Sequence, residues 1–204
     1  MTTTLGAALT DPDRKGPGRP RSARVDEAII DAVIELFSEG VTAEALSIEA
    51  VATRAGVGKA TVYRRWPSKE DLAVAAMETL YSAEMPEPDT GDIRADLAAS
   101  YRSVLAFVNT PEGEAFLRTS IAESVRDDRI AALHRESTER REAASRETFE
   151  RAIARGQVRP DIDVDSAVQW LGGLLATRAI THRPMPRIED ADTLVEFTLR
   201  GVGA

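Results

Sequence analysis

The chain has 204 residues, of which 43% are hydrophobic and 29% charged, and its 34 acidic and 26 basic side chains give a formal net charge of −8. This composition is typical of a globular protein, and an acidic chain taken whole argues against nucleic-acid binding, because phosphates repel it. The absence of cysteine excludes disulfides and thiolate chemistry, and two histidines are too few for a multi-histidine metal site.

Membrane insertion and secretion are not expected either. The longest uncharged stretch of the C-terminal half, 166–177, is well short of the roughly 20 residues that span a bilayer. Residues 1–10 lack the basic start and apolar centre of a secretory signal. We therefore expect a cytoplasmic protein, with no membrane segment, metal or cofactor.

The charge is unevenly distributed. Residues 1–25 carry five basic and two acidic side chains, 53–69 carry five basic and none acidic, and 84–204 have a net charge of −6. Three prolines and two glycines in 10–21 oppose helix formation, and a second Pro/Gly cluster at 85–91 indicates a boundary. We expect a flexible basic arm (1–21), a first folded domain (22–84) and a second (85–204).

Apolar residues recur at three- and four-residue intervals through the folded part, the period of an amphipathic helix, and no convincing strand alternation occurs. Local signals mark helix starts at Ser47, at Ser68 and at Thr110 before Pro111. A long polar helix is expected to carry ion pairs between residues four positions apart. These are Glu136 with Arg140, Glu142 with Arg146, and Glu147 with Arg151. The fold class is therefore all-α, with about nine helices, including segments near 28–40, 59–65, 92–108, 128–155, 164–181 and 190–199.

The segment 44–72 predicts two short helices joined by a tight turn at Gly56, the plan of a helix-turn-helix. Its second helix is too hydrophilic to fill a core, and in a DNA reader such a helix enters the major groove. An ordinary helical hairpin with a solvated basic face is the alternative. The expected contacts are Lys59 and Thr61 to base edges, Tyr63 to a phosphate, Arg64 to either, and Lys69 with the following helix N-terminus to another phosphate.

Residues 47–72 (SIEAVATRAGVGKATVYRRWPSKEDL) resemble the signature of the TetR family of bacterial transcriptional regulators. The resemblance covers 25–80 and implies a homodimer that binds double-stranded DNA at a palindromic operator. With the arm, it makes DNA-contact candidates of Arg19, Arg21, Ser47, Gly58, Lys59, Ala60, Thr61, Tyr63, Arg64, Ser68 and Lys69.

The tetrapeptide from Gly18 to Arg21 resembles an arm whose arginines enter the narrow minor groove of A·T-rich DNA. A disordered, solubilising tail would have the same composition. The sequence leaves both interpretations open.

The family resemblance also implies a helical C-terminal domain that binds a small effector and dimerises through its last two helices, 163–181 and 189–202. A weaker resemblance to one C-terminal subfamily lies in 89–97 and 152–159. The candidates for ligand contact are Tyr101, Phe107, Phe116, Trp170 and Arg178.

Each of these ligand candidates has a structural alternative. Aromatic residues at helical spacing are commonly core, and Arg178 could equally pair across a dimer or extend to solvent. His134 is expected to be exposed within a charged helix. The pair Gly172 and Gly173 indicates close approach, either at a dimer seam or against a ligand.

These observations predict a dimeric, effector-responsive repressor and no enzyme. A DNA-binding regulator without an effector, acting constitutively or architecturally, and an activator of the same family share the DNA-reading features. A helical enzyme would need a convergent acid/base set, and the sequence offers no catalytic candidate.

Overall fold

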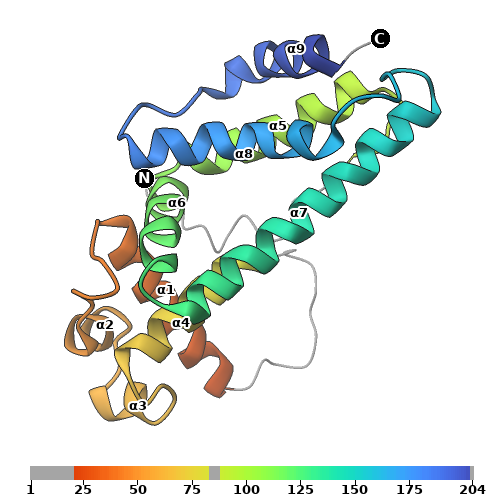
Figure 1. Cartoon of the computed structure of the whole chain (residues 1–204). Coiled ribbons are helices and arrows are strands. Elements are labelled where there is room, and N and C mark those ends of the chain that lie inside the picture. The colour runs from red at the N-terminus through yellow and green to blue at the C-terminus, as the bar shows by residue number, and fades with distance from the viewer. Residues whose placement is uncertain (1–20, 83–87, 203–204) are drawn as a thin grey trace. The chain divides into compact units, whose positions relative to one another are not determined.

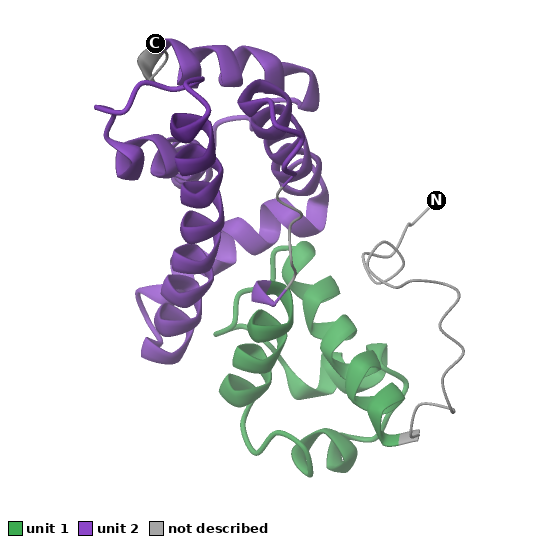
Figure 2. Cartoon of the chain, turned by 90° about the vertical axis from the view of Figure 1, so that its right-hand side faces the viewer, with its two compact units in different colours: residues 1–80 green, residues 81–204 purple. Residues whose placement is uncertain are grey.

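The computed structural model describes residues 21–82 and 88–202, and within these ranges the fold is all-α, with nine α-helices, one short 3-10 helix and no strand (Figure 1). The predicted fold class is confirmed. The chain divides into two compact units, 1–80 and 81–204 (Figure 2). The helices are α1 (Arg21–Ser38), α2 (Ile48–Arg54), α3 (Lys59–Tyr63), α4 (Lys69–Tyr81), α5 (Ile93–Val108), α6 (Pro111–Ser124), α7 (Asp128–Ala154), α8 (Val164–Ile180), η2 (Ile188–Asp190) and α9 (Ala191–Val202).

The first unit is built on one apolar face of α1. Ile29 and Val33 of this helix are fully buried, together with Val51 of α2, Val62 of α3 and Leu72 of α4. Helix α1 already begins at Arg21, so the helix starts at the last residue of the predicted arm. The rest of that arm, including Arg19, lies outside the described residues, and the Arg21 side chain is also not described.

In the second unit, α5 packs against α6 and α9, and α7 packs against α6 and α8. Its fully buried side chains come from separate segments and include Leu105 of α5, Phe149 of α7, Val158 after α7 and Val195 of α9. The last helix is therefore part of the core of this unit as well as of its surface. No helix in the two described ranges is long and apolar enough to cross a membrane.

The two stretches that carried the weaker subfamily resemblance contact each other. The Gln157 side chain accepts a hydrogen bond from the Ile93 backbone N–H (3.1 Å) and donates one to the Gly91 carbonyl (2.8 Å). Arg155 donates to Asp89 at 2.9 Å. These residues therefore tie the start of α5 to the end of α7, which gives both stretches a structural role.

The local helix-start signals are correct in two places and incomplete in a third. Thr110 accepts a hydrogen bond from the Gly113 backbone N–H (2.9 Å) ahead of Pro111, as predicted. The Ser68 hydroxyl likewise accepts from the Asp71 backbone N–H at 3.0 Å. Ser47 occupies the N-cap of α2, but its side chain makes no capping hydrogen bond.

Tyr81, the last residue of α4, belongs to the second unit. Its side chain is 3% exposed, and its ring meets Phe116 edge-on at a centroid distance of 5.0 Å. The two compact units meet between residues 80 and 81, close to the boundary at 84/85 expected from the Pro/Gly cluster.

Candidate functional site

Helices α2 and α3 pack through small and β-branched side chains. Val51 and Val62 are fully buried and Ala52 is 3% exposed. Gly56 adopts φ +67 in the turn, a left-handed conformation that glycine enters without penalty. The Val57 backbone N–H donates to the Ala52 carbonyl at 2.9 Å, which closes the turn. This local geometry is a helix-turn-helix with one face of α3 buried and the other outward.

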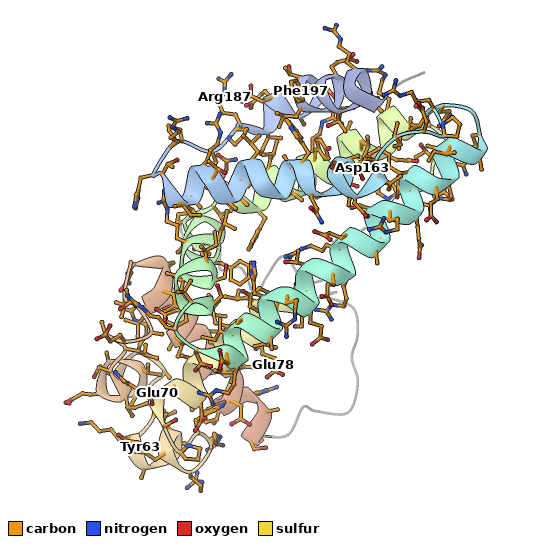
Figure 3. All side chains as sticks on the ribbon, viewed as in Figure 1. Tyr63, Glu70, Glu78, Asp163, Arg187 and Phe197 are labelled. Carbon is orange, nitrogen blue, oxygen red and sulfur yellow. The ribbon has the colours of Figure 1, made fainter. Side chains whose placement is uncertain are left out.

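The outward face of α3 presents the residues expected to touch DNA. Lys59, Ala60, Tyr63 and Arg64 are exposed, and Thr61 is half-buried. Tyr63 is 52% exposed, an unusual position for a tyrosine that contributes to a core (Figure 3). The structure thus brings the α3 candidates together on one surface, beside the exposed N-cap Gly58.

Two other arginines of this basic stretch serve the fold. The Arg54 guanidinium donates two hydrogen bonds to Glu39, at 2.7 and 3.0 Å. Arg65 pairs with Asp26 of α1 and also donates to the Thr61 carbonyl. These interactions join α2 to the residue that follows α1, and the segment after α3 to α1 itself. A count of basic residues therefore overstates how many are available to DNA.

Lys59 is also engaged, but at the surface. Its Nζ lies 2.8 Å from Oε2 of Glu49 on α2, with side chains 53% and 72% exposed respectively. The hydrogen bond from Lys59 lowers the pKa of the Glu49 carboxyl below its ordinary value. An exposed pair of this kind is weak and is screened by salt, so Lys59 can exchange its partner.

The other candidates for phosphate contact lie at the starts of α2 and α4, and two of the three already make hydrogen bonds within the protein. The Lys69 ammonium donates to the Glu44 carbonyl in the loop before α2. The Ser68 hydroxyl donates to Asp71 at 2.6 Å while it caps the start of α4. Ser47 is exposed. These three residues therefore differ in availability: Ser47 is open, whereas Ser68 and Lys69 have internal partners.

The second unit contains an open cavity of about 800 Å³ lined by residues of α5, α6, α7 and α8. Tyr101, Phe107 and Phe116 line it, as expected. Tyr101 is 6% exposed, and its hydroxyl is fixed by a 3.0 Å hydrogen bond with Thr198 of α9. The expected aromatic lining is therefore formed by residues that also belong to the core.

Trp170 and Arg178, the other two ligand candidates, are not among the residues that line this cavity. Trp170 stacks on Phe197 of α9 with ring centroids 4.9 Å apart. The Arg178 guanidinium donates to the Pro184 carbonyl at 2.6 Å, which holds the loop after α8. Both side chains leave α8 on sides other than the one facing the cavity.

Sequence reasoning missed the polar residues of the cavity wall, of which His134 and Arg141 are two. His134 was expected to be exposed, yet it is half-buried, lines the cavity and lies 2.9 Å from the Tyr81 hydroxyl. Burial, with a smaller contribution from Arg141, lowers the pKa of His134. Arg141 also lines the cavity. Both lie on the strongly charged α7, where the local sequence does not distinguish them from solvated neighbours.

Both units match one protein family. Residues 29–76 match the family described as bacterial regulatory proteins, tetR family, and residues 87–198 match the tetracyclin repressor-like C-terminal domain. The chain belongs to the TetR family. It is a DNA-binding transcriptional regulator and not an enzyme, like the TetR-family proteins to which it is similar.

Individual regulatory proteins resemble the chain over most of its length. AqdR, an HTH-type transcriptional regulator of Rhodococcus erythropolis, is 33% identical over 82% of this chain and 80% of its own. A TetR-family regulator from Mesorhizobium loti matches with a TM-score of 0.68 at 26% identity, covering 91% of this chain and 100% of that one. FrrA, described as a flavonoid-responsive regulator, matches with a TM-score of 0.62 at 26% identity, covering 89% and 98%.

We expect the Lys59–Glu49 pair to oppose DNA binding, because Glu49 occupies the lysine and its carboxylate repels phosphate. Glu49→Gln is therefore expected to tighten binding to the operator about threefold at low salt, with a smaller gain at high salt. Fluorescence anisotropy titrations with operator DNA at two salt concentrations measure the effect. Glu78→Gln removes the same charge from an exposed site on α4. Equal effects of the two variants would contradict a specific role for Glu49.

Proposed function

We propose that this protein is a homodimeric repressor that leaves a palindromic operator when a small molecule binds its second unit. The observation that carries the proposal is the presence, in one TetR-family chain, of an outward basic α3 and of a cavity of about 800 Å³ in the other unit. Cavities of this size are typical of small-molecule sites. The cytoplasm, where genomic DNA lies, is the expected location.

In the proposed complex, α3 of each protomer lies in one major groove. Lys59 and Thr61 contact base edges, Tyr63 a phosphate and Arg64 either, beside the backbone at Gly58 and Ala60. Ser47, Ser68 and Lys69 lie along the phosphates at the ends of α2 and α4. The arm arginines, Arg19 and Arg21, are proposed to enter the adjacent minor groove.

The proposed dimer interface is formed by α8 and α9. Phe197 and Ile180 are both 62% exposed, and Trp170 packs flat against Phe197. Large exposed apolar side chains are a common mark of an association surface. TetR-family regulators form dimers, and two copies of α3 about 34 Å or more apart would fit successive major grooves.

The proposed regulation is a shift between two conformers of the dimer. A ligand that binds more tightly to the conformer with unsuitable α3 spacing lowers operator affinity without touching the DNA-contacting residues. The similarity to FrrA, which is described as flavonoid-responsive, supports a small-molecule effector for this chain.

Selection of bound fragments from native genomic DNA tests the proposal, since it yields the operator and the adjacent genes together. A shared palindrome is the expected result, and fragments with no common sequence would contradict it. A compound screen for release from that operator then tests the effector. Persistent binding against all compounds would favour a regulator without an effector.

A further inference from the structure

The acidic, basic and histidine side chains that line the cavity, among the described residues, all come from one helix. Among the described lining residues they are His134, Arg140, Arg141 and Glu142, all on α7. Two arginines therefore face one carboxylate. The remaining lining side chains are apolar or neutral, so the cavity has a surplus of positive charge.

Three of these four side chains have partners within the protein. Arg140 donates to the Tyr81 carbonyl at 3.1 Å, and Glu142 accepts from the Gln169 amide at 3.4 Å. His134 is hydrogen-bonded to the Tyr81 hydroxyl. Burial lowers the pKa of His134 and raises that of Tyr81 to about 12, so both are neutral at pH 7.

Arg141 is different. Within the described part of the chain, no carboxylate pairs with Arg141 and no group accepts a hydrogen bond from it. Its side chain lines the cavity and is also exposed to solvent. Partial desolvation by the surrounding side chains lowers the pKa of the guanidinium; Tyr81 opposes this effect and Arg140 adds to it. A guanidinium remains charged throughout, and an anion in the cavity would supply the missing partner.

The apolar part of the wall comes from α5, α6 and α8. Phe107 and Phe116 meet edge-to-face, with ring centroids 5.9 Å apart, and Leu117, Ile121 and Leu175 lie around the same cavity. An aromatic pair of this geometry offers ring faces and edges to a further ring. The site therefore combines an aromatic surface with the Arg141 guanidinium, to which the described residues offer no carboxylate.

We propose that the cavity binds an aromatic organic anion, with its acid group on Arg141 and its ring system against Phe107 and Phe116. Only one part of the inference rests on the proposed function, namely that this ligand is the effector. Binding of the ligand to the cavity can be measured without DNA. Arg141 gives the site its preference for a negative charge. Phe107 and Phe116 give it its preference for an aromatic ring system.

Two fluorescent probes with the same ring skeleton test this proposal. 8-Anilinonaphthalene-1-sulfonate is an aromatic anion, and N-phenyl-1-naphthylamine is its neutral counterpart. The full-length protein is expected to bind the anion more tightly. Arg141→Gln is expected to weaken binding of the anion about tenfold or more and to leave the neutral probe unchanged.

Two further variants locate the site. Arg135→Gln removes an exposed arginine from α7 that does not line the cavity, and both probes should bind as before. Gly172 lines the cavity, and a Cβ added there meets no atom within 4 Å. Gly172→Leu should therefore fold, fill the cavity and weaken both probes. Unchanged binding of both probes to Gly172→Leu, or equal effects of Arg141→Gln and Arg135→Gln, would overturn the inference.

Operator release is measured separately. If the anion binds through Arg141 but leaves the operator complex intact, the inference stands and effector control by this ligand class fails. If an aromatic acid releases the operator equally well from the parent and from Arg141→Gln, effector control stands and the inference is overturned.

Discussion

Replacing Lys59 and Tyr63 together with alanine is expected to weaken operator binding roughly 100-fold, because each contact with a base or phosphate contributes about 1–3 kcal/mol. Their side chains are 53% and 52% exposed, so truncation leaves the packing of α3 unchanged. The helix is held from its other face by the fully buried Val62. The loss should therefore appear in DNA affinity and not in stability.

Anisotropy titrations at one fixed salt concentration measure this loss, and thermal unfolding shows whether the fold is retained. Arg135→Ala removes an exposed basic residue of the second unit and should stay within about twofold of the parent protein. Operator binding of the double variant at parental affinity would show that another surface reads the DNA.

Features set by adjacent residues were predictable from the sequence. The Thr110 cap involves only the hydrogen bond with Gly113, three residues later, and the adjacent Pro111. The local sequence therefore predicts it directly. The turn at Gly56 similarly follows from one residue's conformational freedom. The apolar period of α1 identified the helix face that is buried.

Contacts between distant residues were not predictable in this way. Spacing favoured a pair between Glu136 and Arg140, but Arg140 instead donates to the Tyr81 carbonyl, 59 residues away. The Lys59–Glu49 pair depends on how α2 crosses α3. Of the expected i,i+4 pairs, 147 with 151 is present, at 3.8 Å. Tertiary packing offers a long side chain more partners than its own helix does.

The assignments on α8 show a second limit. Apolar residues surround nearly the whole of this helix, so periodicity does not select the side that faces the cavity. Trp170 and Arg178 were chosen as ligand contacts for their chemistry alone, and the backbone directs them to Phe197 and Pro184. Gly172 and Gly173 both line the cavity, which favours the ligand side of the two alternatives left open by the sequence.

Phe197→Asp should convert the proposed dimer to a monomer at micromolar concentration and weaken operator binding at least 100-fold. The side chain is 62% exposed on α9, so a carboxylate is tolerated there in an isolated protomer. In an interface formed by α8 and α9, the same carboxylate is buried against the partner without a counter-charge, which costs several kcal/mol. A monomer engages one half-site only and loses the second α3.

Sedimentation equilibrium measures the association, and anisotropy with operator DNA measures its consequence. Val125→Asp makes the same change at an apolar residue that is 86% exposed after α6 and outside the proposed interface, and it should remain dimeric. Circular dichroism should show equal helix content for both variants, since neither side chain is buried in the protomer. A Phe197→Asp variant that sediments as a dimer would place the interface on another surface, while loss of the dimer in Phe197→Asp alone would assign association to the Phe197 face of α9.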